Sequence, residues 1–219
     1  MHAHEGYASA RRFFTSGTAP SYDSVSLFAT LGRDRTWKRK IVEIAGKRGI
    51  VLDLACGTGI LSSMVAANGA SVTGLDMTFE YLAWGHTNPI CQGTAEVLPF
   101  RDGTFDAVVS SYLAKYVDSR LAVGECWRVL QPRGVAVFHD FACPTGAMRG
   151  IWNAYFAVLQ LAGVFSKSWR PVFAELDYVI CKSRWVENIS GTMRERGFKN
   201  INVSYHTLGT AAITWGYKQ

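Results

Sequence analysis

Two glycines, Gly57 and Gly59, directly follow a short run of β-branched and leucine residues that begins at Ile50. Apolar residues then recur with helical spacing, so the pattern predicts a buried strand, a tight turn and a helix N-terminus. Glycine adopts conformations closed to other residues, and the first N–H groups of a helix are free, so such a turn can cradle a ligand. Glycines at this spacing also serve purely steric turns, and alone they are a weak signal.

Two carboxylates sharpen the prediction. Asp53 stands near the end of the first strand, where it would repel the pyrophosphate of a dinucleotide and attract a cation. S-adenosylmethionine carries a sulfonium and an ammonium and no phosphate. The next predicted strand, 70–76, ends in Asp76, which can accept hydrogen bonds from both hydroxyls of a ribose. Asp53, and Ser62 where a dinucleotide pattern has Gly or Ala, argue against a nicotinamide-dependent dehydrogenase.

From these residues onward the sequence resembles the class I S-adenosylmethionine-dependent methyltransferases. The resemblance continues through 93–100, 105–111 and 128–134. The flanks resemble the family that C-methylates the quinone ring in ubiquinone and menaquinone biosynthesis, through Tyr22-Asp23, 32–39 and 210–218. The resemblance implies a Rossmann-like α/β fold, with a mostly parallel seven-stranded sheet, a C-terminal antiparallel hairpin strand and helices on both faces.

The resemblance also implies S-adenosyl-L-methionine as cofactor and gives it a set of contacts. The residues expected to contact its methionine end, its ribose, its adenine and its reacting end follow one another along the chain. The residues expected to bind the cofactor are Asp53, Ala55, Gly57, Thr58, Gly59, Asp76, Met77, Thr94, Ala95 and Ser111.

A ring carbon becomes nucleophilic when a neighbouring hydroxyl loses its proton, so C-methylation calls for a base near the sheet edge. The catalytic candidates are Asp140, His139 and Lys115, and Tyr112 and His206 are also available. Similar quinone methyltransferases carry Gly-x-Arg-Asn after the serine that matches Ser111, and a Glu where this chain has Asp140.

The segment that corresponds to Gly-x-Arg-Asn here is Leu113-Ala114-Lys115-Tyr116. Lys115 keeps the charge but loses the planar fork of arginine, and Tyr116 replaces an amide. A different ring, or a differently substituted quinone, would explain the change.

An apolar helix is predicted over 151–164, followed by an irregular stretch through Arg184. Such a helix is expected to pack against the core. The alternative is that it lines a pocket for an apolar acceptor. The candidate acceptor-binding residues are Tyr22, Tyr112, Trp152 and Tyr155. The best hypothesis for the acceptor is a lipophilic quinol such as demethylmenaquinol. A polar metabolite, another natural-product ring and a non-catalytic S-adenosylmethionine-binding protein are the alternatives.

A chain of 219 residues with 48% hydrophobic content matches one methyltransferase domain. Its expected parts are a helical lid (1–48), a cofactor-binding core (49–142), and acceptor-side helices with the C-terminal strands (143–219). Within the core, one helix is expected to include Leu130, and the fifth strand is expected over 135–141.

The net charge of +6 fits nucleic acid, an anionic membrane surface or an acidic substrate. Much of the excess lies in 33–48, where Trp37, Ile41 and Ile44 have helical spacing, so an amphipathic helix with a solvated basic face is expected. Membrane docking through this face is the second option. Little resembles a nucleic-acid module.

No apolar run has the length of a membrane span and the N-terminus lacks the core of a signal peptide, which points to the cytoplasm. No metal site is expected, because the cysteines are scattered without ligand spacing, and all are expected to be reduced thiols. They are Cys56, Cys91, Cys126, Cys143 and Cys181. A homodimer is suggested by the resemblance only.

Overall fold

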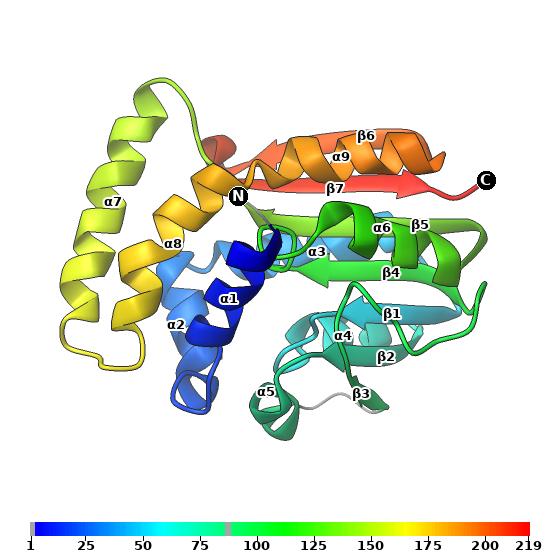
Figure 1. Ribbon diagram of the computed structural model, residues 1–219, viewed down its shortest axis with the longest axis horizontal. Coiled ribbons are helices and arrows are strands. Elements are labelled where there is room, and N and C mark those ends of the chain that lie inside the picture. Colours follow the sequence, from blue (N-terminus) through cyan, green and yellow to red (C-terminus); the bar gives the residue numbers. More distant parts are fainter. Residues whose placement is uncertain (1–2, 86–88) are drawn as a thin grey trace.

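The computed structural model describes residues 3–85 and 89–219. Within them, seven strands form one sheet in the order β3-β2-β1-β4-β5-β7-β6 (Figure 1). The strands are β1 (Ile50–Leu54), β2 (Ser71–Asp76), β3 (Ile90–Gln92), β4 (Phe105–Ser111), β5 (Leu130–Phe141), β6 (Lys199–His206) and β7 (Ala211–Tyr217). Strands β1 to β5 are parallel, whereas β7 pairs antiparallel with both β5 and β6. The predicted fold class, with its C-terminal antiparallel hairpin, is confirmed.

The helices lie on both faces of this sheet and beyond its edge (Figure 1). They are α1 (Ala3–Phe13), α2 (Tyr22–Ala29), α3 (Arg33–Ala45), α4 (Ile60–Ala67), α5 (Phe79–Trp84), α6 (Ser119–Val129), α7 (Ala147–Gly163), α8 (Arg170–Ser183) and α9 (Trp185–Arg196), with short 3₁₀ turns η1 (Ala19–Ser21) and η2 (Thr207–Gly209).

Alternate strand residues feed two separate cores, because successive side chains of a strand point to opposite faces. Leu52 and Val108 pack with α6 and α9, while Val51 and Val109 pack with α3 and α4. Burial on both faces explains why these strands are almost continuously apolar.

A third core lies beyond the carboxyl ends of the parallel strands. It joins α1, α7 and α8 through large side chains, among them Phe13, Trp152, Phe156 and Trp169. In Figure 1 these helices, with α2, stand at the left-hand end of the sheet. Any ligand bound at the strand ends therefore lies between the sheet and this helical cover.

Two predicted elements are wrong. The stretch before Arg184 is helical from Arg170, because Pro171 suits the first turn of a helix and apolar residues recur on the buried face of α8. These residues are Val172, Phe173, Val179 and Ile180. Leu130 belongs to β5 instead of the preceding helix, and a register shift in the pairing of β4 with β5 accommodates the longer strand.

The sequence also predicts a helix over 78–86. The structure has α5 (Phe79–Trp84) there, and residue 86 lies outside the described residues. No helix within residues 3–85 and 89–219 combines the length and the apolar character needed to cross a bilayer.

The cysteine prediction is also wrong for one pair. Cys143, just after β5, forms a disulfide with Cys181 on α8. The two residues are 38 positions apart and meet only through the fold, so their spacing gave no signal. Cys56 and Cys126 are buried free thiols, and Cys91 is half-buried.

We predict that alkylation of the denatured, unreduced protein modifies the three free cysteines, and that prior reduction raises the number to all five, as measured by mass spectrometry. The double variant Cys143→Ala/Cys181→Ala should lower the free energy of unfolding by up to about 4 kcal/mol, because it frees a long loop in the unfolded chain. Modification of all five cysteines without reductant would contradict the disulfide.

Candidate functional site

Three adjoining cavities lie where β1, β2, β4 and β5 end. The Asp76 cavity, of about 80 Å³, lies between Gly57, Asp76 and Thr94. The Asp53 cavity, of about 40 Å³, lies beneath the glycine turn. The apolar cavity, of about 270 Å³, lies under α7 and α8. Tyr22 and Tyr112 line all three cavities, so the cavities meet at these two rings.

Backbone N–H groups hold the carboxylate of Asp76 in place. Its Oδ2 accepts a hydrogen bond from Gly57 N at 2.9 Å, and its Oδ1 accepts one from Thr78 N at 2.8 Å. Gly57 has φ of +55°, a conformation that suits glycine. Burial raises the pKa of Asp76, although these bonds counteract the shift. A carboxylate oxygen can accept more than one hydrogen bond, so these contacts are compatible with hydroxyl groups of a ligand as further donors.

Asp53 is almost completely buried, and within the described part of the chain only one of its two carboxylate oxygens has a hydrogen-bond partner. Its Oδ2 accepts a hydrogen bond from Ser62 Oγ at 2.5 Å, whereas its Oδ1 has no hydrogen-bond partner among the described residues. Burial raises the pKa of Asp53 to about 6. A buried carboxylate oxygen without a donor is costly, so the position suits a ligand that brings a positive charge.

Sequence reasoning missed Lys38, which also lines the Asp53 cavity. Its Nζ lies 2.5 Å from Asp34 Oδ1, and both side chains are buried. Tyr112 OH donates to the same Oδ1 at 2.7 Å. The cavity thus presents a carboxylate and an ammonium, the complement of an α-amino acid. The only sequence signal was the four-residue spacing of Asp34 and Lys38.

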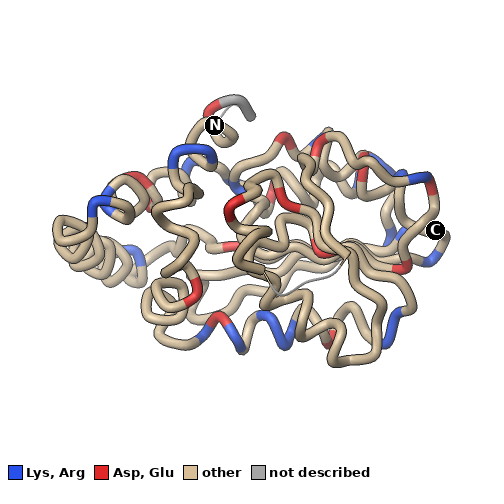
Figure 2. The backbone as a smooth tube through the Cα atoms, turned by 90° about the horizontal axis from the view of Figure 1, so that it is seen from below, with Lys and Arg blue, Asp and Glu red and all other residues tan. Residues whose placement is uncertain are grey.

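The exposed face of α3 matches the prediction of a solvated basic face. Lys and Arg residues follow one another along this helix at the lower edge of Figure 2. Arg35, Arg39, Lys40 and Lys47 are exposed, whereas Lys38 points inward.

The N-terminal helices contact the glycine turn directly. Thr58 Oγ1 donates to Asp23 Oδ1 of α2 at 2.7 Å, and Tyr81 OH donates to Thr18 Oγ1 at 2.9 Å. The rings of Tyr22 and Tyr81 meet edge to face, with centroids 5.2 Å apart. These contacts cover the Asp76 and Asp53 cavities.

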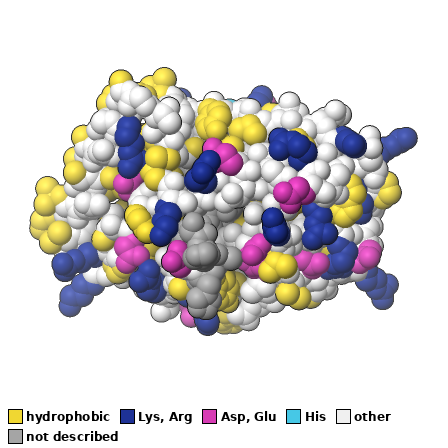
Figure 3. Space-filling view, turned by 45° about the horizontal axis from the view of Figure 1, so that its top comes forward, with side chains coloured by type: hydrophobic (Ala, Val, Ile, Leu, Met, Phe, Trp, Pro, Cys, Tyr) yellow, Lys and Arg dark blue, Asp and Glu magenta, His cyan; other side chains and the backbone are white. Residues whose placement is uncertain are grey.

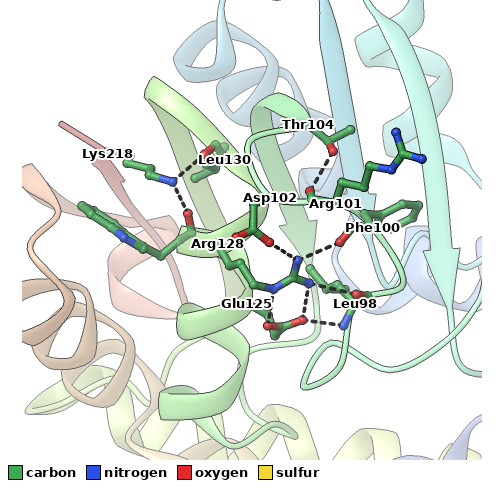
Figure 4. A network of polar contacts seen from close by, with 10 residues as sticks. Leu98, Phe100, Arg101, Asp102, Thr104, Glu125, Arg128, Leu130 and Lys218 are labelled. Carbon is green, nitrogen blue, oxygen red and sulfur yellow. Dashed lines mark hydrogen bonds and ion pairs between the residues drawn. The ribbon is translucent and has the colours of Figure 1, made fainter.

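The loop that carries Thr94 and Ala95 is fixed by Arg128 of α6 (Figure 4). Arg128 donates to Leu98 O at 2.9 Å and to Phe100 O at 2.7 Å, and Glu125 Oε2 accepts from Leu98 N at 2.7 Å. The paired Arg128 guanidinium lowers the pKa of Glu125. The network holds the loop at the wall of the Asp76 cavity.

The structure brings all but one of the predicted cofactor residues to the first two cavities. Gly59 is the exception, since it begins α4 with φ of +83° and serves the turn. Residues that line the Asp76 cavity are Ala55, Gly57, Asp76, Met77, Thr94, Ala95 and Ser111, and those that line the Asp53 cavity are Asp53, Ala55, Gly57, Thr58 and Ser111.

Among the non-glycine residues that line the Asp76 and Asp53 cavities, two have a left-handed backbone. Ala55 has φ of +60° and Tyr112 has φ of +70°. Such a conformation costs about 1–3 kcal/mol, and strain of this kind concentrates at functional sites. Nothing in the local sequence indicates it.

Of the catalytic candidates, Lys115 lines the apolar cavity and Asp140 lies behind it. Lys115 Nζ is 2.6 Å from Asp140 Oδ1 and donates to Tyr112 O at 3.1 Å. Burial lowers the pKa of Lys115 and raises that of Asp140, and the contact between them opposes both shifts.

His139 and His206 line none of the three cavities. His139 Nδ1 lies 2.9 Å from Ser111 Oγ, and its Nε2 has no hydrogen-bond partner among the described residues. Burial lowers the pKa of His139 well below its usual value, so the ring is neutral. His206 lies on β6 beside Ser204.

The four predicted acceptor residues, Tyr22, Tyr112, Trp152 and Tyr155, all line the apolar cavity. Its other walls are mainly aromatic and aliphatic side chains of α2, α7 and α8. Lys115 is the one cationic side chain among the lining residues, and these include no carboxylate and no histidine.

Comparisons with known proteins agree with this geometry. Residues 52–138 match a family model described as a methyltransferase domain. A demethylmenaquinone methyltransferase of Streptomyces avermitilis is 37% identical over 91% of this chain and 90% of its own. A ubiquinone/menaquinone biosynthesis C-methyltransferase of Desulfotalea psychrophila is 32% identical over 91% of this chain and 87% of its own.

Solved structures show the same fold at low identity. A putative S-adenosyl-L-methionine-dependent methyltransferase of Methanococcus maripaludis superposes with a TM-score of 0.69 at 17% identity, covering 93% of each chain. A possible histamine N-methyltransferase of Thermotoga maritima gives 0.67 at 16% identity, covering 98% of this chain and 100% of that one.

We predict that Asp76→Asn weakens binding of S-adenosylmethionine about tenfold to a hundredfold, because hydrogen bonds to a charged acceptor contribute about 1.5–3 kcal/mol. Isothermal titration calorimetry measures the affinity. Glu43→Gln, an exposed change on α3 outside the cavities, is the matched control. Equal affinity of Asp76→Asn and the unaltered protein would remove Asp76 from the ribose site.

Affinity for S-adenosylmethionine should also rise with pH through about 6, the pKa of Asp53. The cationic ligand favours the ionised carboxylate, so protonation competes with binding below that pH and no longer competes above it. Titrations across this range should give a shallower dependence for Asp53→Asn. An unchanged pH dependence in that variant would place the titrating group elsewhere.

Proposed function

The chain belongs to the family of ubiquinone and menaquinone biosynthesis C-methyltransferases, and we propose that its acceptor is a lipophilic quinol of the demethylmenaquinol type, methylated on a ring carbon. It is an S-adenosylmethionine-dependent methyltransferase. The observation that carries the acceptor proposal is the apolar cavity of about 270 Å³ that meets both cofactor-side cavities at Tyr22 and Tyr112.

The first two cavities suit the parts of the cofactor. Asp76 would accept the ribose hydroxyls, and the loop at Thr94 and Ala95 would border the adenine. Asp53 and Lys38 would face the ammonium and the carboxylate of the methionine end, which matches the unpaired Oδ1 of Asp53. When bound, S-adenosylmethionine supplies an electrophilic methyl group.

Lys115 is the residue best placed to act on the acceptor. A hydroquinone carbon becomes nucleophilic when the neighbouring hydroxyl ionises, and a buried cation beside that hydroxyl favours the ionised form. Asp140 does not reach the cavity, and its role would be to position Lys115 and balance its charge. His139 would act in the same indirect way, through Ser111.

The rest of the cavity would orient the ring and exclude water. Trp152 and Tyr155 present flat apolar surfaces, and Tyr22 and Tyr112 stand where the acceptor meets the cofactor. Holding two reactants in line contributes several kcal/mol to lowering the barrier.

A second candidate acceptor is another apolar ring that carries an ionisable hydroxyl. Tyr116 favours it, since this tyrosine stands where similar quinone methyltransferases carry an amide and it lines both the Asp76 and the apolar cavity. The scarcity of polar groups in the apolar cavity weighs against a polar metabolite.

The test is transfer of labelled methyl from S-adenosylmethionine to reduced demethylmenaquinone-type quinols, offered beside a pool of polar metabolites. Label is expected in the quinol fraction. Label in another apolar phenol alone would favour the second candidate. Label in the polar pool would refute both, and tight cofactor binding without any turnover would indicate a binding protein.

In the same assay, Lys115→Met should reduce kcat about a hundredfold or more, because it removes the cation that favours the ionised acceptor. Affinity for S-adenosylmethionine should stay nearly unchanged, and Lys115→Arg should restore part of the rate because it keeps the charge.

Lys115→Met leaves Asp140 unpaired in the core, so the double variant Lys115→Met/Asp140→Asn removes both charges and keeps the comparison valid if the single variant unfolds. Lys47→Met, an exposed change in the turn after α3, is the matched control. Full activity of the folded double variant would exclude this role for Lys115.

A further inference from the structure

Helix α7 is apolar on two opposite sides. Its inner side packs into the core through Trp152, Phe156 and Leu159. On its outer side Ile151, Val158 and Leu161 are exposed, and Val164 and Phe165 continue the exposed surface just beyond its end. Figure 3 shows hydrophobic side chains gathered over the α7 end of the molecule. An exposed apolar face beside a packed one marks an interaction surface.

The exposed surface is continuous with the mouth of the apolar cavity. Leu31, Ile151 and Leu208 are each more than half exposed, and all three also line that cavity. Tyr155 OH donates to Ala29 O, which fixes the middle of α7 against the end of α2. We call the exposed apolar residues of this region the rim: Phe28, Leu31, Ile151, Val158, Leu161, Val164, Phe165 and Leu208.

The charged residues within the segments that carry the rim are all cations, and Asp177 of α8, a carboxylate that contacts α7, pairs with Arg149. These segments, 24–33, 144–174 and 197–219, contain no Asp or Glu. They contain exposed cations next to rim residues, namely Arg33 beside Leu31, and Lys167 and Arg170 beside Phe165. Apolar side chains flanked by cations suit the interface of an anionic bilayer.

We propose that the rim docks the protein on an anionic lipid bilayer, with the mouth of the apolar cavity facing the lipid. A lipophilic acceptor could then pass from the bilayer into the cavity without crossing water. This route rests on the proposed function, whereas docking itself does not.

A second copy of the chain fits the rim less well than a bilayer does. Two copies joined through their rims would bring the same cations together, because neither surface offers a carboxylate from these segments. They would also close the cavity mouth at Leu31, Ile151 and Leu208.

The test is co-sedimentation of the full chain with vesicles of phosphatidylcholine, with or without phosphatidylglycerol, in the absence of cofactor and acceptor. Binding is expected only with phosphatidylglycerol and should weaken with added salt. Lys167→Gln/Arg170→Gln should weaken it about fivefold per charge removed. Leu161→Ser/Phe165→Ser should weaken it about tenfold or more.

Leu121→Ser, an exposed apolar change on α6, is the matched control and should bind like the unaltered protein. The proposal is overturned if the vesicles are not bound, or if both rim variants bind as well as the control. It is also overturned if Leu161→Ser/Phe165→Ser converts a dimer to a monomer in solution without any vesicle binding.

Activity separates docking from the proposed function. The rim variants should methylate a short-chain, water-soluble quinol at the unaltered rate and a vesicle-embedded long-chain quinol more slowly. Rim-dependent vesicle binding without transfer to any quinol would refute the proposed acceptor and leave docking in place.

Discussion

Tyr112 is held from three directions, and all three cavities depend on its position. Its OH donates to Asp34 on α3, its N–H donates to His139 O on β5, and its carbonyl accepts from Lys115 Nζ. Two buried ion pairs, Asp34–Lys38 and Lys115–Asp140, thus meet at one residue. Removing one partner of a buried pair costs about 3–5 kcal/mol, because the other charge stays uncompensated. Helix α3, the sheet edge and the apolar cavity are therefore coupled through a single tyrosine with a left-handed backbone.

The cofactor side of the site could be predicted because its signals are local. Asp53, Gly57 and Asp76 stand at strand ends and turns that hydrophobic patterning already places, and parallel strands bring those ends to one edge. Lys38 could not be predicted in the same way. It is one of several cations in 33–48, and only the packing of α3 against Tyr112 distinguishes it from its solvated neighbours. The pairing of Cys143 with Cys181 likewise depends on a contact between distant segments, whereas α8 had local signals in Pro171 and in the spacing of its apolar residues.

His139 and Asp140 are neighbours on β5, but their side chains lie on opposite faces of the sheet, because successive residues of a strand face opposite sides. Both lie near the end of this strand, as expected. His139 lies against Trp37 and Ser111, whereas Asp140 lies against Lys115. The two side chains therefore cannot serve one cavity together. His139 contacts the cavities through Ser111, and Asp140 through Lys115. The sequence pattern does not show which side of the strand faces the site.

The chemistry of the apolar cavity follows from what its lining residues contain. They include one buried cation, and they include no carboxylate and no histidine that could accept a proton. The tyrosines are no substitute, since burial raises the pKa of Tyr22, Tyr112 and Tyr116 well above its usual value. Under the proposed function, the hydroxyl proton of the acceptor would pass to solvent as the ring binds, and Lys115 would stabilise the anion that remains. Under the same proposal, such a cavity would select apolar rings with a hydroxyl group next to the carbon that is methylated, and a hydroquinone has this arrangement.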